Sequence, residues 1–438
     1  MGDRIKRSRR RTFIKTVGAA SIAGLAGCSS GGGGDSGGDG DSGGDGDSGG
    51  DSGGETDGTT TGSGGSGDPI IIGNAAPTSG AFSPWGRTHR RGLEFAVQEI
   101  NDNGGVLDGR ELQVATQDTE ANPQTASTVF ERLVNNENAA VVTGPVSSDV
   151  GITCRDVAEE LEVPHLPNQA SSTALLTRDT RYTFRVGGTA SPTFVLATLD
   201  AINANEWEIY DAIYADYAYG QSHNAGIERY IQGTEGLSVN VQAAPPQVDD
   251  VQTYLRQVQD GVDILDLGGH PIELFSFIQQ ANELGIEPEL ISGPNIPSSV
   301  MVDSLGDLAF TNVGLFASVD PAAEDYLEVA SRFSESEGTV FEQYHAFGYT
   351  TGQLVAAAVE EAGSADPTAI RDALSGIEYD SILAYPTLSY TEWGEIEEAK
   401  LYGLEFSSDA PSYYEDGNYS VQAFSETDVF DPIDPDDW

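Results

Sequence analysis

From residue 69 onward, short apolar runs alternate with longer segments of helical periodicity. The run at 70–73 is followed by the segment 91–101, where Leu93, Val97 and Ile100 lie on one helix face. The same pattern predicts strands at 112–114 and 139–142, and helices at 125–135 and 150–161. Alternation of strand and helix is typical of a parallel sheet with helices on both faces.

A second alternating series begins after residue 189. It predicts strands at 209–215, 239–241, 264–267 and 290–292, and helices at 192–203, 224–231, 253–259 and 273–284. The two series together exceed the usual size of a single domain, so we expect two α/β lobes with parallel sheets. In such sheets ligands bind outside the carboxyl ends of the strands, beside helix N-termini.

The chain is strongly acidic, with 70 Asp and Glu against 21 Lys and Arg and a formal net charge of −49. After Lys15 its only lysine is Lys400. At molar salt the Debye length falls to ~3 Å, so the self-repulsion of such a chain is largely screened. This composition resembles that of haloarchaeal proteins. We expect no nucleic-acid partner, because after the N-terminal stretch Lys and Arg are too few beside Asp and Glu to form the basic surface that phosphate binding requires.

The N-terminus has the features of an export signal. Residues 9–15, Arg-Arg-Arg-Thr-Phe-Ile-Lys, resemble a twin-arginine motif, and a weakly apolar run follows at 16–26. The run is shorter than the ~20 residues of a spanning helix. It ends in Leu-Ala-Gly-Cys, which resembles a lipoprotein cleavage box and implies that Cys28 carries a lipid. We therefore expect residues 1–27 to be a signal and the mature protein to be anchored at the outer face of the cytoplasmic membrane.

Residues 28–67 after the signal form a Gly/Ser/Asp repeat with almost no apolar residue. Such a segment cannot bury a core, so we expect a disordered tether between the lipid and the folded part.

The sequence shows no constellation that is typical of an enzyme. Its five histidines have no metal-ligand spacing, and neither a G-x-S-x-G motif nor a phosphate-binding loop occurs. Two cysteines cannot form a disulfide framework, and Cys154 is expected to be a small buried thiol. We therefore expect no catalytic residue, no cofactor and no metal.

Four segments resemble the Leu/Ile/Val-binding protein family of solute receptors, which has the type I periplasmic-binding fold. They are Pro77-Thr78-Ser79-Gly80, the stretch from Glu99-Ile100-Asn101 through Gly104-Gly105-Val106 to Arg110, Val142-Thr143-Gly144-Pro145-Val146-Ser147-Ser148, and Tyr214-Ala215-Asp216-Tyr217-Ala218-Tyr219-Gly220. The resemblance extends over 69–405. It implies two Rossmann-like lobes joined by a three-strand hinge, which close around a solute.

By this resemblance the chain crosses between the lobes near residues 188, 317 and 378. The first lobe would comprise 69–188 and 318–377, and the second 189–317 and 378–425. An acidic tail, 426–438, would follow. We expect the stretch from 407 to the end to be loop-like, and we assign no function to its last dozen residues. Asn418-Tyr419-Ser420 is a glycosylation acceptor in this stretch.

The resemblance also places candidate ligand-binding residues in the first lobe. Ser148 lies at a helix start, where the helix dipole favours an anion, although it could be only an N-cap. Ala170 and Ser172 match a second hydroxyl-rich start, or they could belong to an ordinary loop. Trp85 falls where the family has an aromatic side chain over the ligand, with core packing as the alternative.

Three further candidates come from the second lobe. Tyr219 and His270 follow strands, with local packing and a structural hydrogen bond as the alternatives. Asn295 stands where amino-acid-binding members have a Glu that pairs with the ammonium group of the solute. An amide cannot neutralise a buried ammonium. Either Asp216 or another acid replaces that Glu, or the solute has no ammonium group, as in urea and short amides.

We therefore expect a lipid-anchored, monomeric receptor of an ABC importer that binds a branched-chain amino acid or a related small solute. Its partners would be the membrane permease and ATPase subunits. One alternative is a receptor of the same family for urea or a short-chain amide. Another is the ligand-sensing part of a signalling system, which would normally carry a transmembrane segment and an intracellular domain; the sequence shows neither.

Overall fold

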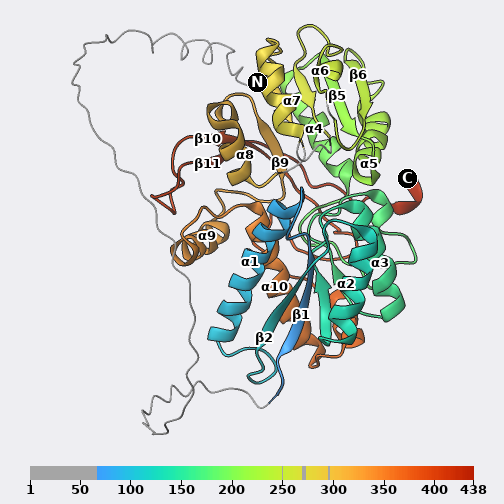
Figure 1. The fold of residues 1–438 in the computed structure, drawn as a ribbon, viewed down its shortest axis with the longest axis vertical. Coiled ribbons are helices and arrows are strands. Elements are labelled where there is room, and N and C mark those ends of the chain that lie inside the picture. The colour runs from blue at the N-terminus through green and yellow to red at the C-terminus, as the bar shows by residue number, and fades with distance from the viewer. Residues whose placement is uncertain (1–66, 249, 269–272, 294–295) are drawn as a thin grey trace, which may run out of the picture. The chain divides into compact units, whose positions relative to one another are not determined.

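The computed structural model describes residues 67–438 except 249, 269–272 and 294–295 (Figure 1). The expected signal, most of the tether, Cys28, His270 and Asn295 therefore lie outside the described residues. In the described part, no helix has the length and apolar character needed to cross a membrane.

The first sheet contains four parallel strands in the order β2-β1-β3-β4. The strands are β1 (Ile70–Ala76), β2 (Leu112–Asp118), β3 (Ala139–Thr143) and β4 (His165–Leu166). The helices between them are α1 (Ser83–Asp102), α2 (Pro123–Asn135) and α3 (Ser148–Leu161). Asn122 begins α2 by accepting hydrogen bonds from two backbone N–H groups of its first turn. Cys154, on α3, is buried and unpaired, as predicted.

The second sheet repeats this plan, with four parallel strands in the order β6-β5-β7-β8. The strands are β5 (Ile209–Ala215), β6 (Ser238–Ala244), β7 (Ile264–Asp266) and β8 (Leu290–Ser292). The α-helices are α4 (Ser191–Asn205), α5 (Ala218–Gly226), α6 (Gln252–Leu255) and α7 (Glu273–Glu283), and a π-helical turn, Ile227–Ile231, continues α5. The two series of strands and helices predicted from periodicity are both present.

The remaining chain adds helices and a small antiparallel sheet, β11-β10-β9. Its strands are β9 (Gly314–Ala317), β10 (Tyr402–Ser407) and β11 (Ser420–Glu426), and the helices are α8 (Ser298–Leu305), α9 (Glu324–Glu337), α10 (Gln343–Ala362) and α11 (Pro367–Ser375). Single helical turns lie at Thr173–Leu175, Gly306–Phe310 and Pro435–Asp437. The expectation of a loop-like stretch after 407 was wrong, because β11 pairs along β10 there.

Helices α1 and α10 pack backbone against backbone beside the first sheet (Figure 1). A Cβ on Gly92 would lie 2.0 Å from the carbonyl oxygen of His345, and a Cβ on Gly348 would lie 2.0 Å from that of His89. Larger residues at either glycine would force the helices apart. Burial lowers the pKa of His89 to about 3, so its ring is neutral inside this contact.

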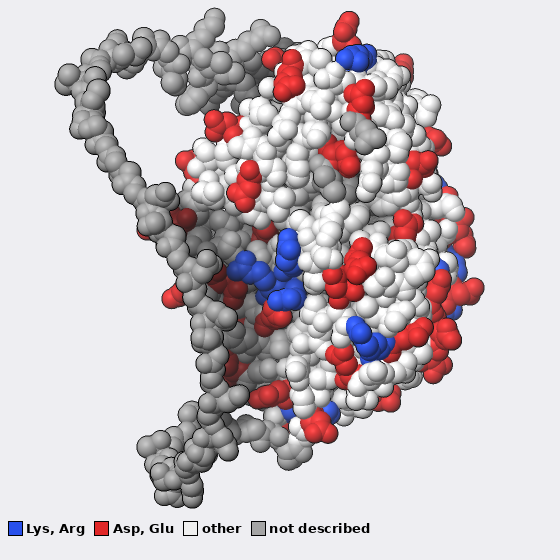
Figure 2. All heavy atoms as spheres, viewed as in Figure 1, with Lys and Arg blue, Asp and Glu red and all other residues white. Residues whose placement is uncertain are grey.

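Acidic side chains are scattered over the face shown in Figure 2, with few basic ones among them. Near the C-terminus, acidic residues pair with one arginine that follows the first sheet and with another that lies between β5 and β6. Asp434 accepts a hydrogen bond from Arg178, and Asp437 lies 2.8 Å from Arg229 of the π-helical turn. Such exposed ion pairs contribute ~0–1 kcal/mol each and weaken with salt.

A buried ion pair supports the loop that follows β4. The Arg185 guanidinium lies 2.9 Å from Glu395, and both side chains are at most 5% exposed. Arg185 also donates to the backbone carbonyl groups of Ala170 and Ser172. One side chain therefore joins the loop at 170–172 to a segment more than two hundred residues away.

A second buried carboxylate joins α10 to the start of α8. Glu342 precedes α10 and accepts hydrogen bonds from the backbone N–H group of Ser299, at 3.2 Å, and from its hydroxyl, at 3.0 Å. Burial raises the pKa of Glu342 to about 7, and the hydrogen bonds from Ser299 partly oppose this shift. The native protein therefore holds a proton on Glu342 at pH values where the unfolded chain has released it.

We expect Arg185→Met to lower the free energy of unfolding by about 3–5 kcal/mol, because it leaves the Glu395 carboxylate buried without a partner of opposite charge. Denaturant unfolding at fixed salt measures the effect. Replacing Glu395 by Met as well should recover most of the loss. Arg90→Met is the matched control, since Arg90 forms an exposed pair with Glu94 and should cost less than about 1 kcal/mol. An equal loss in the two single variants would contradict the role given to Arg185.

We expect Glu342→Gln to gain stability relative to the wild type as pH rises. A raised native pKa contributes stability that is fully present below the unfolded pKa and is lost as pH rises through the native value near 7. Between pH 5 and pH 8 the variant should therefore gain roughly 2 kcal/mol over the wild type. Denaturant unfolding at both pH values checks this, with Glu335→Gln at an exposed carboxylate as the control. A difference that does not change with pH would exclude a buried, protonatable Glu342.

Candidate ligand-binding site

A cavity opens where the strands of both sheets end. In the first sheet, β1 and β3 are neighbours, yet the chain leaves β1 for β2 on the opposite side. The strands β5 and β7 have the same relation in the second sheet. The loops after such strands diverge and leave a crevice at the carboxyl edge. The cavity is lined by residues that follow these four strands and by neighbouring side chains.

The cavity is small and has mainly aromatic walls. Its volume is about 50 Å³, measured as the space open to the centres of water-sized molecules. Its lining residues are Phe82, Trp85, Val146, Ser148, Gln169, Phe194, Thr198, Tyr217, Tyr219, His223, Asp266, Gly268, Ser292, Gly293 and Phe316. Apolar walls with a few fixed polar groups suit a small solute that has both apolar and polar parts.

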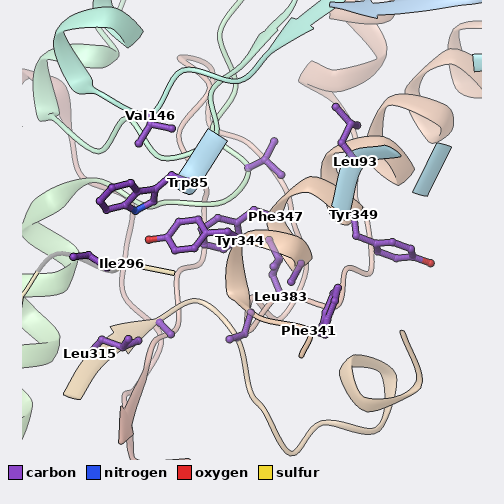
Figure 3. Close-up of a cluster of buried hydrophobic side chains, with 14 of the residues drawn as sticks. Trp85, Leu93, Val146, Ile296, Leu315, Phe341, Tyr344, Phe347, Tyr349 and Leu383 are labelled. Atoms are coloured by element: carbon purple, nitrogen blue, oxygen red, sulfur yellow. The ribbon is translucent and has the colours of Figure 1, made fainter. Parts of the chain in front are cut away.

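Trp85 lies in the first turn of α1, directly after the loop that leaves β1. Its ring is 4% exposed and lies 5.7 Å, between centroids, from Phe82. A hydrogen bond joins Trp85 to the buried hydroxyl of Tyr344, which points toward the indole in Figure 3. The hydrogen bond from α10 therefore holds the indole ring of Trp85 in its place in the cavity wall.

Ser148 is the first residue of α3 and lines the cavity. Its hydroxyl oxygen accepts a hydrogen bond from the backbone N–H of Ser172, at 3.1 Å. The side chains of Ala170 and Ser172 are buried beside the cavity and are not among its lining residues. Ala170 packs in a small apolar cluster, and the Ser172 hydroxyl caps the turn Thr173–Leu175.

Gln169, which was not predicted from the sequence, lines the cavity on the same side. Its Oε1 atom is buried without a hydrogen-bond partner among the described residues. Such an orphaned acceptor is costly unless a ligand or water satisfies it. Gln169 is therefore a candidate to accept a hydrogen bond from a bound solute.

Tyr217 and Tyr219 come directly after β5 and form the cavity wall on the side of the second sheet. Their ring centroids lie 6.2 Å apart, and Tyr219 stacks on His223 at 6.0 Å with an interplanar angle of 18°. Burial raises the pKa of both tyrosines, so their hydroxyls stay protonated and can donate hydrogen bonds. Asp216, the candidate acid, is exposed and accepts a hydrogen bond from Gln221 instead of lining the cavity.

A hydrogen-bonded group of polar side chains closes the cavity at β7. Asp266, the last residue of β7, accepts hydrogen bonds from the Tyr210 hydroxyl at 2.7 Å and from Nε2 of His223 at 2.9 Å. Nδ1 of His223 lies 3.4 Å from the Ser191 hydroxyl. In the described part of the chain, no three His, Cys, Asp or Glu residues are grouped to hold a metal ion.

The structure thus brings Trp85, Ser148 and Tyr219 to one cavity and leaves Ala170 and Ser172 just behind it. His223 and Asp266 were not among the residues predicted from the sequence. The available signal was an acidic residue inside the apolar run Ile264-Leu265-Asp266-Leu267, because a buried strand seldom contains an unpaired acid.

Comparison with known proteins agrees with this architecture. Residues 69–403 match the model of the family described as "Periplasmic binding protein". A curated relative from Brucella abortus, "Leu/Ile/Val-binding protein homolog 7", is 25% identical over 334 residues, covering 71% of this chain and 82% of its own length.

Two solved structures share the fold. One is the branched-chain amino acid transporter substrate-binding protein LivJ from Streptococcus pneumoniae in complex with isoleucine, with a TM-score of 0.70, 19% identity and coverage of 83% of this chain and 100% of the other. The other is a solute-binding protein of an ABC transporter from R. palustris in complex with benzoate, with a TM-score of 0.68, 18% identity and coverage of 84% and 98%. The predicted type I periplasmic-binding fold is confirmed, and the chain belongs to the periplasmic binding protein family.

Proposed function

We propose that this protein is the exported solute receptor of an ABC importer and that it binds a branched-chain amino acid or a closely related small solute. The observation that supports this most directly is the small aromatic cavity between the carboxyl ends of two parallel sheets. A site lined from both sheets encloses a solute only while the two halves are together, so lobe closure couples binding to a change of shape. A membrane permease would recognise that change and an ATPase would drive transfer.

The proposed lobes follow the boundaries expected from the sequence, 69–188 with 318–377 and 189–317 with 378–425. All strands of the first sheet precede residue 188, and α10 packs on α1 of that sheet. The strands of the second sheet lie within the second lobe. Strand β10 pairs with β9, and Val313, the residue before β9, forms an isolated bridge with Ile291 of β8. These pairings support the division.

A branched-chain amino acid is favoured by the isoleucine complex of the pneumococcal protein and by the names of the curated relatives. Urea or a short amide is the second candidate. It is favoured by Asn295, which replaces the ammonium-pairing Glu that the family resemblance leads one to expect.

Calorimetric titration of the full chain in molar salt against leucine, valine, urea and acetamide tests this proposal. We expect leucine or valine to bind at least about tenfold more tightly than the two amides, a difference of ~1.4 kcal/mol. Trp85→Ala should weaken that binding by about tenfold or more, since it removes an aromatic wall. Trp393→Ala is the matched control, because Trp393 packs under Arg178 and does not line the cavity. Tighter binding of an amide would favour the second candidate, and binding of none of the four would overturn the proposal.

The same receptor would be held at the membrane through a lipid on Cys28 after twin-arginine export. The proposals of twin-arginine export and of a lipid on Cys28 are based on the sequence of residues 9–28. We expect Cys28→Ser to move the exported protein from the membrane fraction to the medium, because the lipid is the anchor. Fractionation of producing cells measures the change, with Cys154→Ser as the control at a buried thiol. Retention of Cys28→Ser in the membrane fraction would exclude this anchor.

A further inference from the structure

Very few acidic side chains are buried in the part of the chain that the structure describes, although the full sequence has 70 of them. In the part that the structure describes, four Asp and Glu side chains are buried, namely Asp211, Asp266, Glu342 and Glu395. Burial of a carboxylate is costly unless hydrogen bonds or an opposite charge compensate it. Each of the four therefore needs an explanation.

Three of the four have structural partners away from the cavity. Asp211 accepts hydrogen bonds from Asn240 and Gln259, Glu342 from Ser299, and Glu395 from Arg185. None of these three acids lines the cavity, whereas Asp266 does. Among the described residues, Asp266 is the one carboxylate that a solute in the cavity can contact.

The hydrogen bonds of Asp266 are gathered on one of its two oxygens. The Tyr210 hydroxyl and Nε2 of His223 both donate to Oδ2, at 2.7 and 2.9 Å. Oδ1 takes part in neither bond. A carboxylate can accept several donors, and Asp266 lines the cavity, so its Oδ1 can accept a further donor from a bound solute.

The surroundings of His223 hold Asp266 in this orientation. A Cβ on Gly268 would lie 2.7 Å from Cδ2 of His223, so the ring fits only because residue 268 is a glycine. The ring of Tyr219 stacks on that of His223, and the Ser191 hydroxyl lies near Nδ1 of the histidine. The position of the Asp266 carboxylate therefore depends on residues from α4, α5 and the loop after β7.

We propose that Asp266 receives the protonated amine of the solute, and that His223 and Tyr210 position it for this contact. The inference rests on the proposed function and sharpens it. The receptor would select solutes that carry an amine together with a carboxylate and would reject carboxylates without nitrogen. The benzoate complex of the R. palustris protein shows that its fold also binds acids of the second kind.

The negative charge of Asp266 explains why the cavity would favour solutes with an amine over acids without nitrogen. An ammonium group buried against Oδ1 keeps a partner of opposite charge, whereas the same group beside an amide has none. A solute without nitrogen would leave Oδ1 buried and unpaired. Its own negative charge would also lie in the same small cavity as Asp266. Both effects weaken nitrogen-free acids relative to amino acids.

The test compares leucine with 4-methylpentanoate, which is leucine without its amine, by calorimetry on the full chain in molar salt. The wild type should bind leucine at least about 30-fold more tightly, the size of effect expected for a desolvated charge pair. Asp266→Asn should reduce leucine affinity by about 30-fold or more and leave 4-methylpentanoate unchanged or tighter. The preference for the amine would then disappear.

Asp216→Asn is the matched control, since it removes one negative charge just after β5 without touching the cavity. It should retain the preference for leucine. Equal binding of the two acids by the wild type would overturn the inference even if Asp266→Asn fails to fold. Equal weakening of both acids in Asp266→Asn would show a structural role only and would also overturn it. In either case, tight binding of leucine by the wild type still supports the proposed function. A wild type that binds none of leucine, 4-methylpentanoate, urea and acetamide would overturn both the proposed function and the role given to Asp266.

Discussion

Parallel strands end at the same edge of a sheet, and this constraint decides where a solute can bind to the protein. Helices cover the faces of both sheets, so the carboxyl edges are the places where loops converge without a helix across them. The crossing of the chain from β1 to β2 and from β5 to β6 separates the loops and leaves a crevice at each edge. The location of the cavity thus follows from topology, while the residues of the loops determine its chemistry.

Periodicity predicted the elements of both sheets because their helices have one apolar face and their strands are short apolar runs. Periodicity did not predict the helices and strands that follow β8. Helix α10 is buried around nearly its whole circumference, so the contrast between an apolar and a polar face is lost. Strand β11 is largely exposed and polar, and only pairing with β10 makes it a strand. These elements depend on contacts that are distant in sequence, which a local pattern does not contain.

The residues of the candidate site also fall into two groups, those that the sequence predicted and those that only the folded sheet brings together. Ser148 and Tyr219 follow strand ends within segments that carry the family resemblance, and Trp85 lies shortly after another such segment. All three line the cavity. His223 lies one turn inside a helix, and its partner Asp266 is 43 residues further along the chain. Their contact requires β5 and β7 to be neighbours and requires a glycine at 268. Only the assembled sheet brings these conditions together.

The electrostatic setting explains why one buried carboxylate can matter in a chain with a net charge of −49. The surface charges of such a protein would attract cations and repel anions over a long range at low salt. At molar salt the Debye length of ~3 Å would remove that effect, so surface acids would not discriminate between an amino acid and a simple carboxylate. A contact inside a cavity that excludes salt is screened far less. Selection by charge is then restricted to desolvated groups, and among the described residues of the cavity Asp266 is the acid that meets this condition.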